Sequence, residues 1–423
     1  MQGTISALEL VCHLENQSFL PTTTNLDSIL YNSVPASHLG RPSSASISPC
    51  HETSWKDCPG NSRDMKGGPC RMSFTIIGSS YTNDVYTYSF EGDSLALKSS
   101  VEVGFHPSWI AFHPEDRSLI FAGLEQDEGK IIAIKYDAEF KGTVVAESSS
   151  GGKDPCSVVV VKDELLIANY SSGSISALPV SQNAPYILAD TPTSTITLSG
   201  SGPNQERQLS PHTHQVIYID EYNEILVPDL GGDRVYRLKK DAKGTWNIAG
   251  HIDHEAGSGP RHVAVHDGYL YTLLELKSSI AKHSFPRSPT SDVKFIAKTP
   301  TMYNPPPLPN DMLAAEILIP QPNPTFTTPY VYVSNRNHPS PEGDSVAIFS
   351  IEKPDAPELI AEVRTGLRHL RGMEFGGPDD RYLCAGGLYA GGVRIFERTE
   401  GGRNLKLVAQ NSSIKSPTGF LWV

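Results

Sequence analysis

From residue 72 onward, short apolar runs that alternate with polar residues recur along the chain and are separated by turns. The first of them, SFTIIGSSYTNDVYTYSF, follows Met72 directly. An alternation with a period of two is typical of a β-strand with one buried face. Glycine (35 residues) and proline (33 residues) are abundant between the runs, which favours many short strands joined by turns over helices.

One unit of this pattern repeats. Clear copies begin at His106, Asp154, Ser210, Gly259 and Leu367, and a weaker copy covers AAEILIPQPNPTFTTPYVYVSNRN. In each copy a turn leads to an alternating run, a second apolar run follows, and a short turn leads to a third. The copies recur at intervals of roughly 50 residues, a period typical of the blades of a β-propeller.

A split copy predicts how the ring closes. The segment SFTIIGSSYTNDVYTYSF has no leading strand, and SPTGFLWV at the end of the sequence is a leading strand without a partner. Pairing the two segments would complete one more blade and remove open sheet edges. We therefore predict an all-β, seven-bladed propeller closed by its N- and C-terminal strands. A single large sandwich is the alternative, which the regular spacing disfavours.

Two long interruptions, residues 182–209 and 286–312, are each expected to hold the outer strand of a blade and an excursion over one face. Pro305, Pro306 and Pro307 lack backbone donors and are not expected in a central strand. Residues 1–71 differ from the rest, being rich in Ser, Pro and Gly without a periodic apolar pattern. We expect a disordered or dispensable leader there, followed by one domain over 72–423.

Charge and composition narrow the partners. The net charge is −12 and the pI about 5.6, which argues against a nucleic-acid partner. No apolar run reaches the roughly 20 residues that a membrane span needs, and no secretory signal is visible. The six cysteines show no zinc-type spacing and are expected to be free thiols in a reducing compartment, so we predict a cytoplasmic protein without a membrane partner.

Polar residues beside the inner strands are the candidates for function, because a propeller brings equivalent positions of different blades together at its axis. His214 precedes one such strand and Arg261 lies in the next blade. Glu275 interrupts the apolar run YTLLELKSS, and Arg336 ends VYVSNR. Together they predict a largely cationic cup, which favours a small anionic ligand because guanidinium groups bind carboxylate or phosphate with two N–H groups.

Structural interpretations remain open for each residue. Arg261 and Arg336 could bind backbone carbonyls or carboxylates between blades, and Glu275 could pair with one of them. The His212-Thr213-His214 stretch supplies at most two metal ligands, so no metal site is predicted, and His212 alone suits a turn.

Weaker candidates for substrate binding are Asp229 and Asn169, which open turns, together with His212. The sequence contains no Gly-x-Ser-x-Gly element, no P-loop and no dinucleotide fingerprint, so no cofactor is predicted.

Four segments resemble a known family. They are SGSGPNQERQLSPHTHQV, VPDLGGDRVYRL, GSGPRHVAVHDGYLYTLLELKSSI and YVSNRN with GDSVAIFSI, and the resemblance spans Ser73 to Val423. The chain resembles the seven-bladed propeller lactonases, which include bacterial-type 6-phosphogluconolactonases and fungal carboxy-cis,cis-muconate cyclases. By motif, the catalytic histidine, two arginines and glutamate of the cyclase branch fall on His214, Arg261, Arg336 and Glu275.

The resemblance implies a metal-independent hydrolase of a small anionic lactone such as 6-phosphogluconolactone. In this hypothesis Arg261 and Arg336 hold the anionic group and stabilise charge on the lactone oxygen, and His214 activates water. Glu275 orients a partner or shuttles a proton. Two alternatives stay open: a muconate-type lactonising cyclase that uses the same residues, and a binding propeller without turnover. The proline-rich stretch near residue 305 departs from the compact bacterial pattern.

Overall fold

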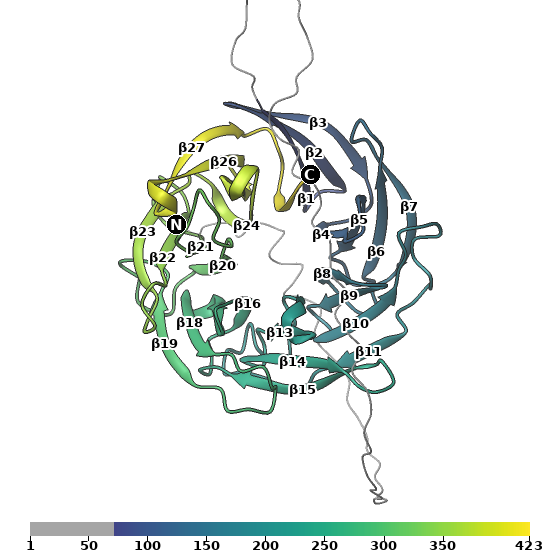
Figure 1. Cartoon of the computed structure of the whole chain (residues 1–423), viewed down its shortest axis with the longest axis horizontal. Coiled ribbons are helices and arrows are strands. Elements are labelled where there is room, and N and C mark those ends of the chain that lie inside the picture. Colours follow the sequence, from purple (N-terminus) through teal and green to yellow (C-terminus); the bar gives the residue numbers. More distant parts are fainter. Residues whose placement is uncertain (1–71) are drawn as a thin grey trace, which may run out of the picture. The chain divides into compact units, whose positions relative to one another are not determined.

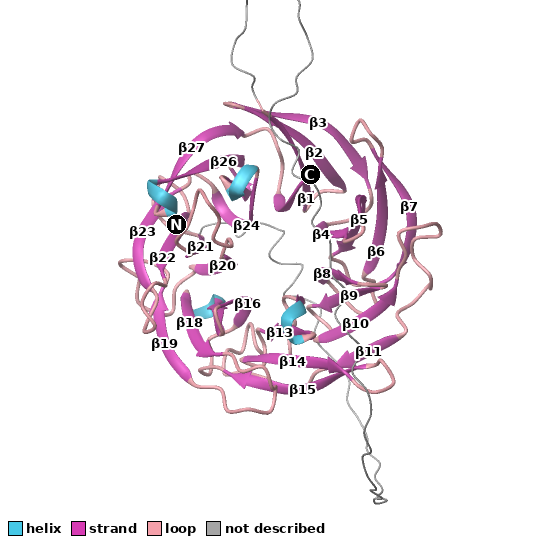
Figure 2. Ribbon diagram, viewed as in Figure 1, coloured by secondary structure: helices cyan, strands magenta, loops and turns pink. Residues whose placement is uncertain are grey.

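The computed structural model describes residues 72–423, and the predicted disordered leader, with four of the six cysteines, lies outside the described residues. Within them the chain forms seven four-stranded antiparallel sheets arranged in a ring (Figures 1 and 2), as the repeat pattern predicted. The first strand of each sheet lies toward the axis and the fourth strand forms the rim. We number these sheets as blades 1 to 7.

Each blade is a set of four neighbouring strands, listed here from the axis to the rim. Blade 1 is β28 (Pro417–Trp422), β1 (Ser73–Ser80), β2 (Asp84–Glu91) and β3 (Ser94–Glu102); blade 2 is β4 (Pro107–His113), β5 (Asp116–Leu124), β6 (Lys130–Tyr136) and β7 (Gly142–Ser149); blade 3 is β8 (Pro155–Val161), β9 (Glu164–Asn169), β10 (Ser174–Pro179) and β11 (Ser194–Thr197); blade 4 is β12 (Ile217–Ile219), β13 (Glu224–Asp229), β14 (Arg234–Lys240) and β15 (Trp246–Asp253). Blade 5 is β16 (Pro260–His266), β17 (Tyr269–Leu274), β18 (Ser279–Ser284) and β19 (Phe295–Pro300); blade 6 is β20 (Leu313–Leu318), β21 (Tyr330–Arg336), β22 (Ser345–Ser350) and β23 (Glu358–Arg364); blade 7 is β24 (Arg368–Gly376), β25 (Tyr382–Ala390), β26 (Gly392–Thr399) and β27 (Asn404–Asn411). Short 3-10 turns are η1 (Asp220–Tyr222), η2 (Glu275–Lys277), η3 (Pro378–Asp380) and η4 (Glu400–Gly402).

Burial follows each strand's place in its blade. The second strands lie between neighbouring blades, and every residue of β13 and β21 is buried. Their apolar stretches, ILVP in β13 and YVYV in β21, do not alternate with polar residues because both faces are covered. The outer strand β7 has only one buried residue, and its other positions are exposed or half-buried. Both long interruptions contain the outer strand predicted for them, β11 and β19, and Pro305–Pro307 lie outside all strands.

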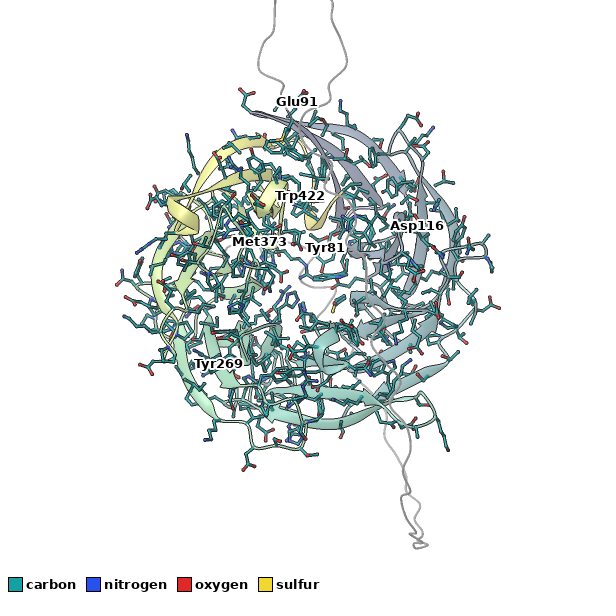
Figure 3. All side chains as sticks on the ribbon, viewed as in Figure 1. Tyr81, Glu91, Asp116, Tyr269, Met373 and Trp422 are labelled. Atoms are coloured by element: carbon teal, nitrogen blue, oxygen red, sulfur yellow. The ribbon has the colours of Figure 1, made fainter. Side chains whose placement is uncertain are left out.

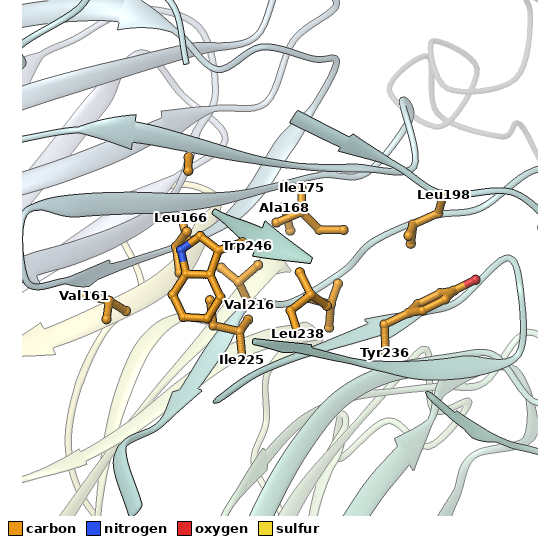
Figure 4. Packing of buried hydrophobic residues seen from close by; sticks show 12 residues of the cluster. Val161, Leu166, Ala168, Ile175, Leu198, Val216, Ile225, Tyr236, Leu238 and Trp246 are labelled. Carbon is orange, nitrogen blue, oxygen red and sulfur yellow. The ribbon is translucent and has the colours of Figure 1, made fainter. Parts of the chain in front are cut away.

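The hydrophobic core consists of layers between adjacent blades. The layer between blades 3 and 4 combines Leu166 and Ile175 with Ile225, Leu238 and Trp246 (Figure 4). The Trp246 indole also donates a hydrogen bond to Glu164 of blade 3, with 3.1 Å between Nε1 and Oε2. Each blade therefore buries its apolar faces only against its two neighbours, and the ring must close for the first and last blades to be covered.

The predicted closure is confirmed. Strand β28 pairs with β1 in antiparallel register, with Ile76 opposite Trp422 and Gly78 opposite Phe420. Trp422 packs on Phe74 and Phe90, and its indole nitrogen donates to the carbonyl of Glu374 in blade 7 at 3.1 Å. One aromatic side chain thus ties the two ends of the described domain to the last blade.

A Trp422→Phe substitution should weaken this closure. It removes the hydrogen bond to Glu374 and part of a ring that is 9% exposed, so we expect a loss of about 1–2 kcal/mol in unfolding free energy. Urea denaturation measures the change. Val423→Ala is the matched control, because Val423 is 41% exposed and its truncation should change stability by less than about 0.5 kcal/mol.

Candidate active site

The four predicted catalytic residues come from the same face of the ring, at which first strands begin and second strands end. His214 precedes β12, Arg261 is the second residue of β16, Glu275 follows β17 and starts η2, and Arg336 is the last residue of β21. Strand β12 has only three residues, because Thr213 instead forms an isolated bridge with Asp229. The chain therefore leaves regular strand geometry where the two histidines lie.

The carboxylate of Glu275 joins three arginines. Its Oε2 lies 2.9 Å from Nε of Arg261 and 2.7 Å from Nη2 of Arg336, and its Oε1 lies 2.6 Å from Nη2 of Arg207. Glu275 is 1% exposed, whereas the Arg207 side chain is 27% exposed. A single buried carboxylate thus balances three guanidinium groups, and a positive charge excess remains around it.

Protonation of Glu275 is strongly disfavoured. Burial alone would raise the pKa of this carboxyl, but the charges of Arg336, Arg207 and Arg261 outweigh burial and hold its pKa well below the ordinary value. Glu275 is therefore ionised at neutral pH. Of the two roles considered for it, the orientation of neighbouring groups agrees with this state, while a proton shuttle does not.

His214 is a buried, neutral imidazole. Burial, followed by the charges of Arg261 and other neighbours, lowers the pKa of His214 well below its ordinary value. The ring lies edge-on to Tyr170 and to His262, with centroid distances of 5.5 and 5.1 Å. Its Nδ1 is buried and has no hydrogen-bond partner among the described residues. A ring with an unsatisfied nitrogen is an informative feature, because buried polar atoms are normally paired.

Arg261 and Arg336 contact both a carboxylate and backbone carbonyls, the two kinds of structural partner considered for them in the sequence analysis. Besides its ion pair with Glu275, Arg261 donates to the carbonyl of Ala315, and Arg336 donates to the carbonyl of Ala314 at 3.2 Å. Arg336 Nη1 also lies 3.4 Å from Nε2 of His369. These hydrogen bonds engage Nη atoms of both side chains, whereas the Nε atoms of Arg261 and Arg336 are buried and make no hydrogen bond to the described residues.

The three weaker candidates have structural surroundings. Asp229 Oδ1 accepts backbone N–H groups of His212 (2.7 Å), Gly231 and Gly232 (both 3.0 Å), which closes the loop after β13. Asn169 donates to Ser150 and to the Ser176 hydroxyl.

Asp229 and Asn169 are both 0% exposed, so their placement gives no support to the prediction that they contact a substrate. His212 is half-buried, stacks on Tyr170 at 4.5 Å and contacts the Tyr170 carbonyl at 3.1 Å. Its imidazole holds a turn beside His214, as expected for a structural residue.

Arg207 is the residue of this cluster that sequence reasoning missed. It lies in the loop between β11 and β12, within the motif GPNQERQ, where no strand periodicity marks it. Gln208, its neighbour, fixes the loop by donating to Leu230 and Asp233, both at 2.8 Å. The motif itself was the only available signal for Arg207.

Residues 72–423 lack two features, a candidate metal site and a helix that could span a membrane. They contain no group of three or more His, Cys, Asp or Glu residues that could hold a metal ion. In the same range no helix is long and apolar enough to cross a membrane.

Comparison with known proteins places the chain in a family. Residues 75–422 match the family described as lactonase, 7-bladed beta-propeller. The chain belongs to this lactonase family. This chain is 26% identical over 347 residues to the 6-phosphogluconolactonase of Bacillus subtilis, a match that covers 79% of this chain and 92% of that protein.

A second relative agrees with this assignment, and a solved structure shares the fold. The 6-phosphogluconolactonase of Formosa agariphila is 26% identical to this chain over 336 residues, a match that covers 76% of this chain and 90% of the Formosa protein. The solved structure of a periplasmic gluconolactonase from Pseudomonas aeruginosa superimposes with a TM-score of 0.70 at 18% identity, covering 83% of this chain and 99% of that one. At this identity the structural likeness supports the fold alone.

Proposed function

We propose that this lactonase hydrolyses a small anionic sugar lactone of the 6-phosphogluconolactone type, with His214, Arg261, Glu275 and Arg336 as its catalytic group. Two features carry the proposal: a neutral, partly unpaired His214 whose pKa is lowered by burial and by the charges of Arg261 and Arg336, and a carboxylate, Glu275, that aligns these arginines and Arg207. The names of its relatives supply the reaction class.

In the proposed mechanism, neutral His214 accepts a proton from water as the water oxygen attacks the lactone carbonyl carbon. Arg261 and Arg336 stabilise the negative charge that develops on the carbonyl oxygen. The ring C–O bond then breaks, and the leaving ring oxygen takes the proton back from the imidazolium, which yields the free acid. Ionised Glu275 fixes the arginines and stays unprotonated throughout. No step in this scheme requires a metal ion.

A parallel assay tests the reaction class. Purified protein is offered 6-phosphogluconolactone and a carboxymuconate, and acid release and muconate absorbance are followed separately. Acid release from the lactone is the expected result. Turnover of the muconate alone would favour the cyclase alternative, which would use the same four residues. Turnover of neither compound would favour a binding propeller without catalysis.

The pH dependence of kcat/KM provides a second test. A base must be deprotonated to act, and the low pKa of His214 keeps it deprotonated throughout the neutral range. We expect kcat/KM to stay flat from pH 8 to below pH 6. An unperturbed histidine, with a pKa of about 6.5, would instead make kcat/KM fall on the acid side of that value. An acid limb centred near 6.5 would argue against His214 as the base.

We also propose a cytoplasmic location, in line with the expectation of reduced cysteines. Cys156 and Cys384 are buried free thiols, as expected in a reducing compartment. Cell fractionation with the full chain tests this, and recovery with the membrane or outside the cytoplasm would overturn it.

A further inference from the structure

A second polar cluster lies on the same face of the ring and is built from Tyr81, Glu125 and Arg371. Tyr81 follows β1, Glu125 follows β5 and Arg371 belongs to β24, so blades 1, 2 and 7 each contribute one residue. The Tyr81 hydroxyl donates to the Glu125 carboxylate, 2.8 Å from each oxygen. The Arg371 guanidinium lies over the Tyr81 ring at 4.8 Å and donates from Nη2 to Glu125 Oε2 at 3.3 Å. Figure 3 shows Tyr81 on the inner side of the ring.

Free hydrogen-bonding capacity that reaches accessible space distinguishes Arg371 from Arg261 and Arg336, whose Nε atoms have no hydrogen-bond partner in residues 72–423 but are buried. Glu125 is the only polar partner of its guanidinium among the described residues, although an arginine carries five N–H donors. No nitrogen of Arg371 is buried without a partner, so its unused N–H groups reach accessible space. The Arg371 side chain is 14% exposed, compared with 2% for Arg261 and 5% for Arg336. Arg207, at 27%, is also accessible, but its Nη2 already contacts both Glu275 and Tyr170.

The other two members hold Arg371 in place. Burial raises the pKa of Tyr81 well above its ordinary value, so the phenol stays protonated and continues to donate to Glu125. Glu125 in turn fixes one edge of the guanidinium, and the Tyr81 ring supports its face. Because both Glu125 oxygens accept from Tyr81 and one also accepts from Arg371, this carboxylate is already well satisfied.

Arg371 lies close enough to the Glu275 cluster for the two to interact electrostatically. Its positive charge contributes to the lowered pKa values of His214, Arg261 and Arg336. Taken together, the face carries Arg207, Arg261, Arg336 and Arg371, and the carboxylates in direct ion pairs with them are Glu275 and Glu125. This excess of guanidinium groups suits a ligand with more than one negative charge.

We propose that Arg371, held by Tyr81 and Glu125, binds the phosphate group of a phosphorylated substrate whose lactone ring lies at His214. The inference rests on the proposed lactonase function and assigns the anionic end of the substrate to a different arginine from the pair next to the reacting ring. Arg261 and Arg336 then serve the developing charge on the carbonyl oxygen. Arg371 is a residue for substrate selectivity, and the reaction itself does not pass through it.

The test compares a phosphorylated substrate with an unphosphorylated one. In Arg371→Gln, kcat/KM for 6-phosphogluconolactone should fall by about 10- to 100-fold, mostly through KM, since one charged hydrogen-bonding partner is lost. For glucono-1,5-lactone, which lacks the phosphate, kcat/KM should change by less than about threefold, because no contact at the ring is removed. Arg234→Gln is the matched control, since Arg234 forms an exposed ion pair with Asp253 at 2.8 Å, and both substrates should behave as with the wild type.

Calorimetric titration with 6-phosphogluconate separates this proposal from the proposed function. If the wild type hydrolyses neither lactone, the function fails, while weaker binding of 6-phosphogluconate by Arg371→Gln would still support the phosphate site. Equal losses for both lactones, unchanged selectivity, or no binding of 6-phosphogluconate by the wild type would overturn the site.

If Arg371→Gln does not fold, Tyr81→Phe decides. It should reduce the preference for the phosphorylated lactone by about three- to tenfold, as expected for one lost hydrogen bond, and an unchanged preference would overturn the site.

Discussion

Replacing His214 with alanine is expected to lower kcat for lactone hydrolysis by about 10²- to 10⁴-fold, the contribution typical of a general base. The neutral imidazole has one nitrogen without a partner, so the substitution removes a base without breaking an ion pair or a hydrogen-bond network. Stability should therefore change much less than activity. Steady-state kinetics together with thermal unfolding measure the two effects on the same preparation.

His251→Ala is the control for His214→Ala, because His251 lies on the rim strand β15 with a side chain that is 43% exposed. It should leave kcat unchanged. A loss of less than about threefold in His214→Ala would reject the role of base, since even modest general-base catalysis exceeds that factor. A large loss accompanied by unfolding would instead give His214 a structural role, which its contacts do not suggest.

Much of the fold was predictable because each blade encodes the same local pattern. The first copy lacked a leading strand and the terminal segment SPTGFLWV lacked a partner, and together they predicted that β28 closes on β1. The equivalent places of different repeats also predicted which polar residues would meet, namely His214, Arg261, Glu275 and Arg336. Their convergence on one face is a consequence of the ring.

The same repeat logic could have found the second cluster. Glu125 follows β5 as Glu275 follows β17, and Tyr81 follows β1 as Tyr170 follows β9, so each pair occupies equivalent positions. These residues were not singled out, because a charged or aromatic residue at a strand end is common and has no distinctive motif. Their contacts become visible only when blades 1, 2 and 7 are adjacent.

Side-chain partnerships could not be predicted from the sequence. Glu275 was considered a partner for one of Arg261 and Arg336, and it contacts both as well as Arg207, which comes from a loop without periodicity. Asp229 and Asn169 were considered for substrate binding, which stays a prediction; their buried side chains bond backbone and hydroxyl groups, and each keeps one oxygen without a partner among the described residues. The sequence does not distinguish a short polar side chain that bonds local backbone groups at a turn from one that binds a ligand.

The second large effect concerns stability. Glu275→Gln is expected to lower the unfolding free energy by about 3–5 kcal/mol, because it leaves buried guanidinium groups without their counter-charge. Since the folded-state pKa of Glu275 is depressed, its stabilisation is fully present above the ordinary carboxyl value of about 4.3 and is lost as pH falls through the lower folded value. The difference between wild type and variant should thus be constant from pH 8 to 5 and should shrink on further acidification.

Chemical denaturation across this pH range measures the effect, with Glu221→Gln as the control. Glu221 forms an ion pair with Arg287 at 3.0 Å, but its side chain is 72% exposed, and exposed pairs contribute only about 0–1 kcal/mol. Inorganic phosphate should raise the unfolding temperature of Glu275→Gln more than that of the wild type, because an anion can take the place of the missing carboxylate among Arg207, Arg261 and Arg336. A variant as stable as the wild type would mean that the three arginines do not depend on Glu275, and the alignment on which the proposed catalysis rests would then be wrong.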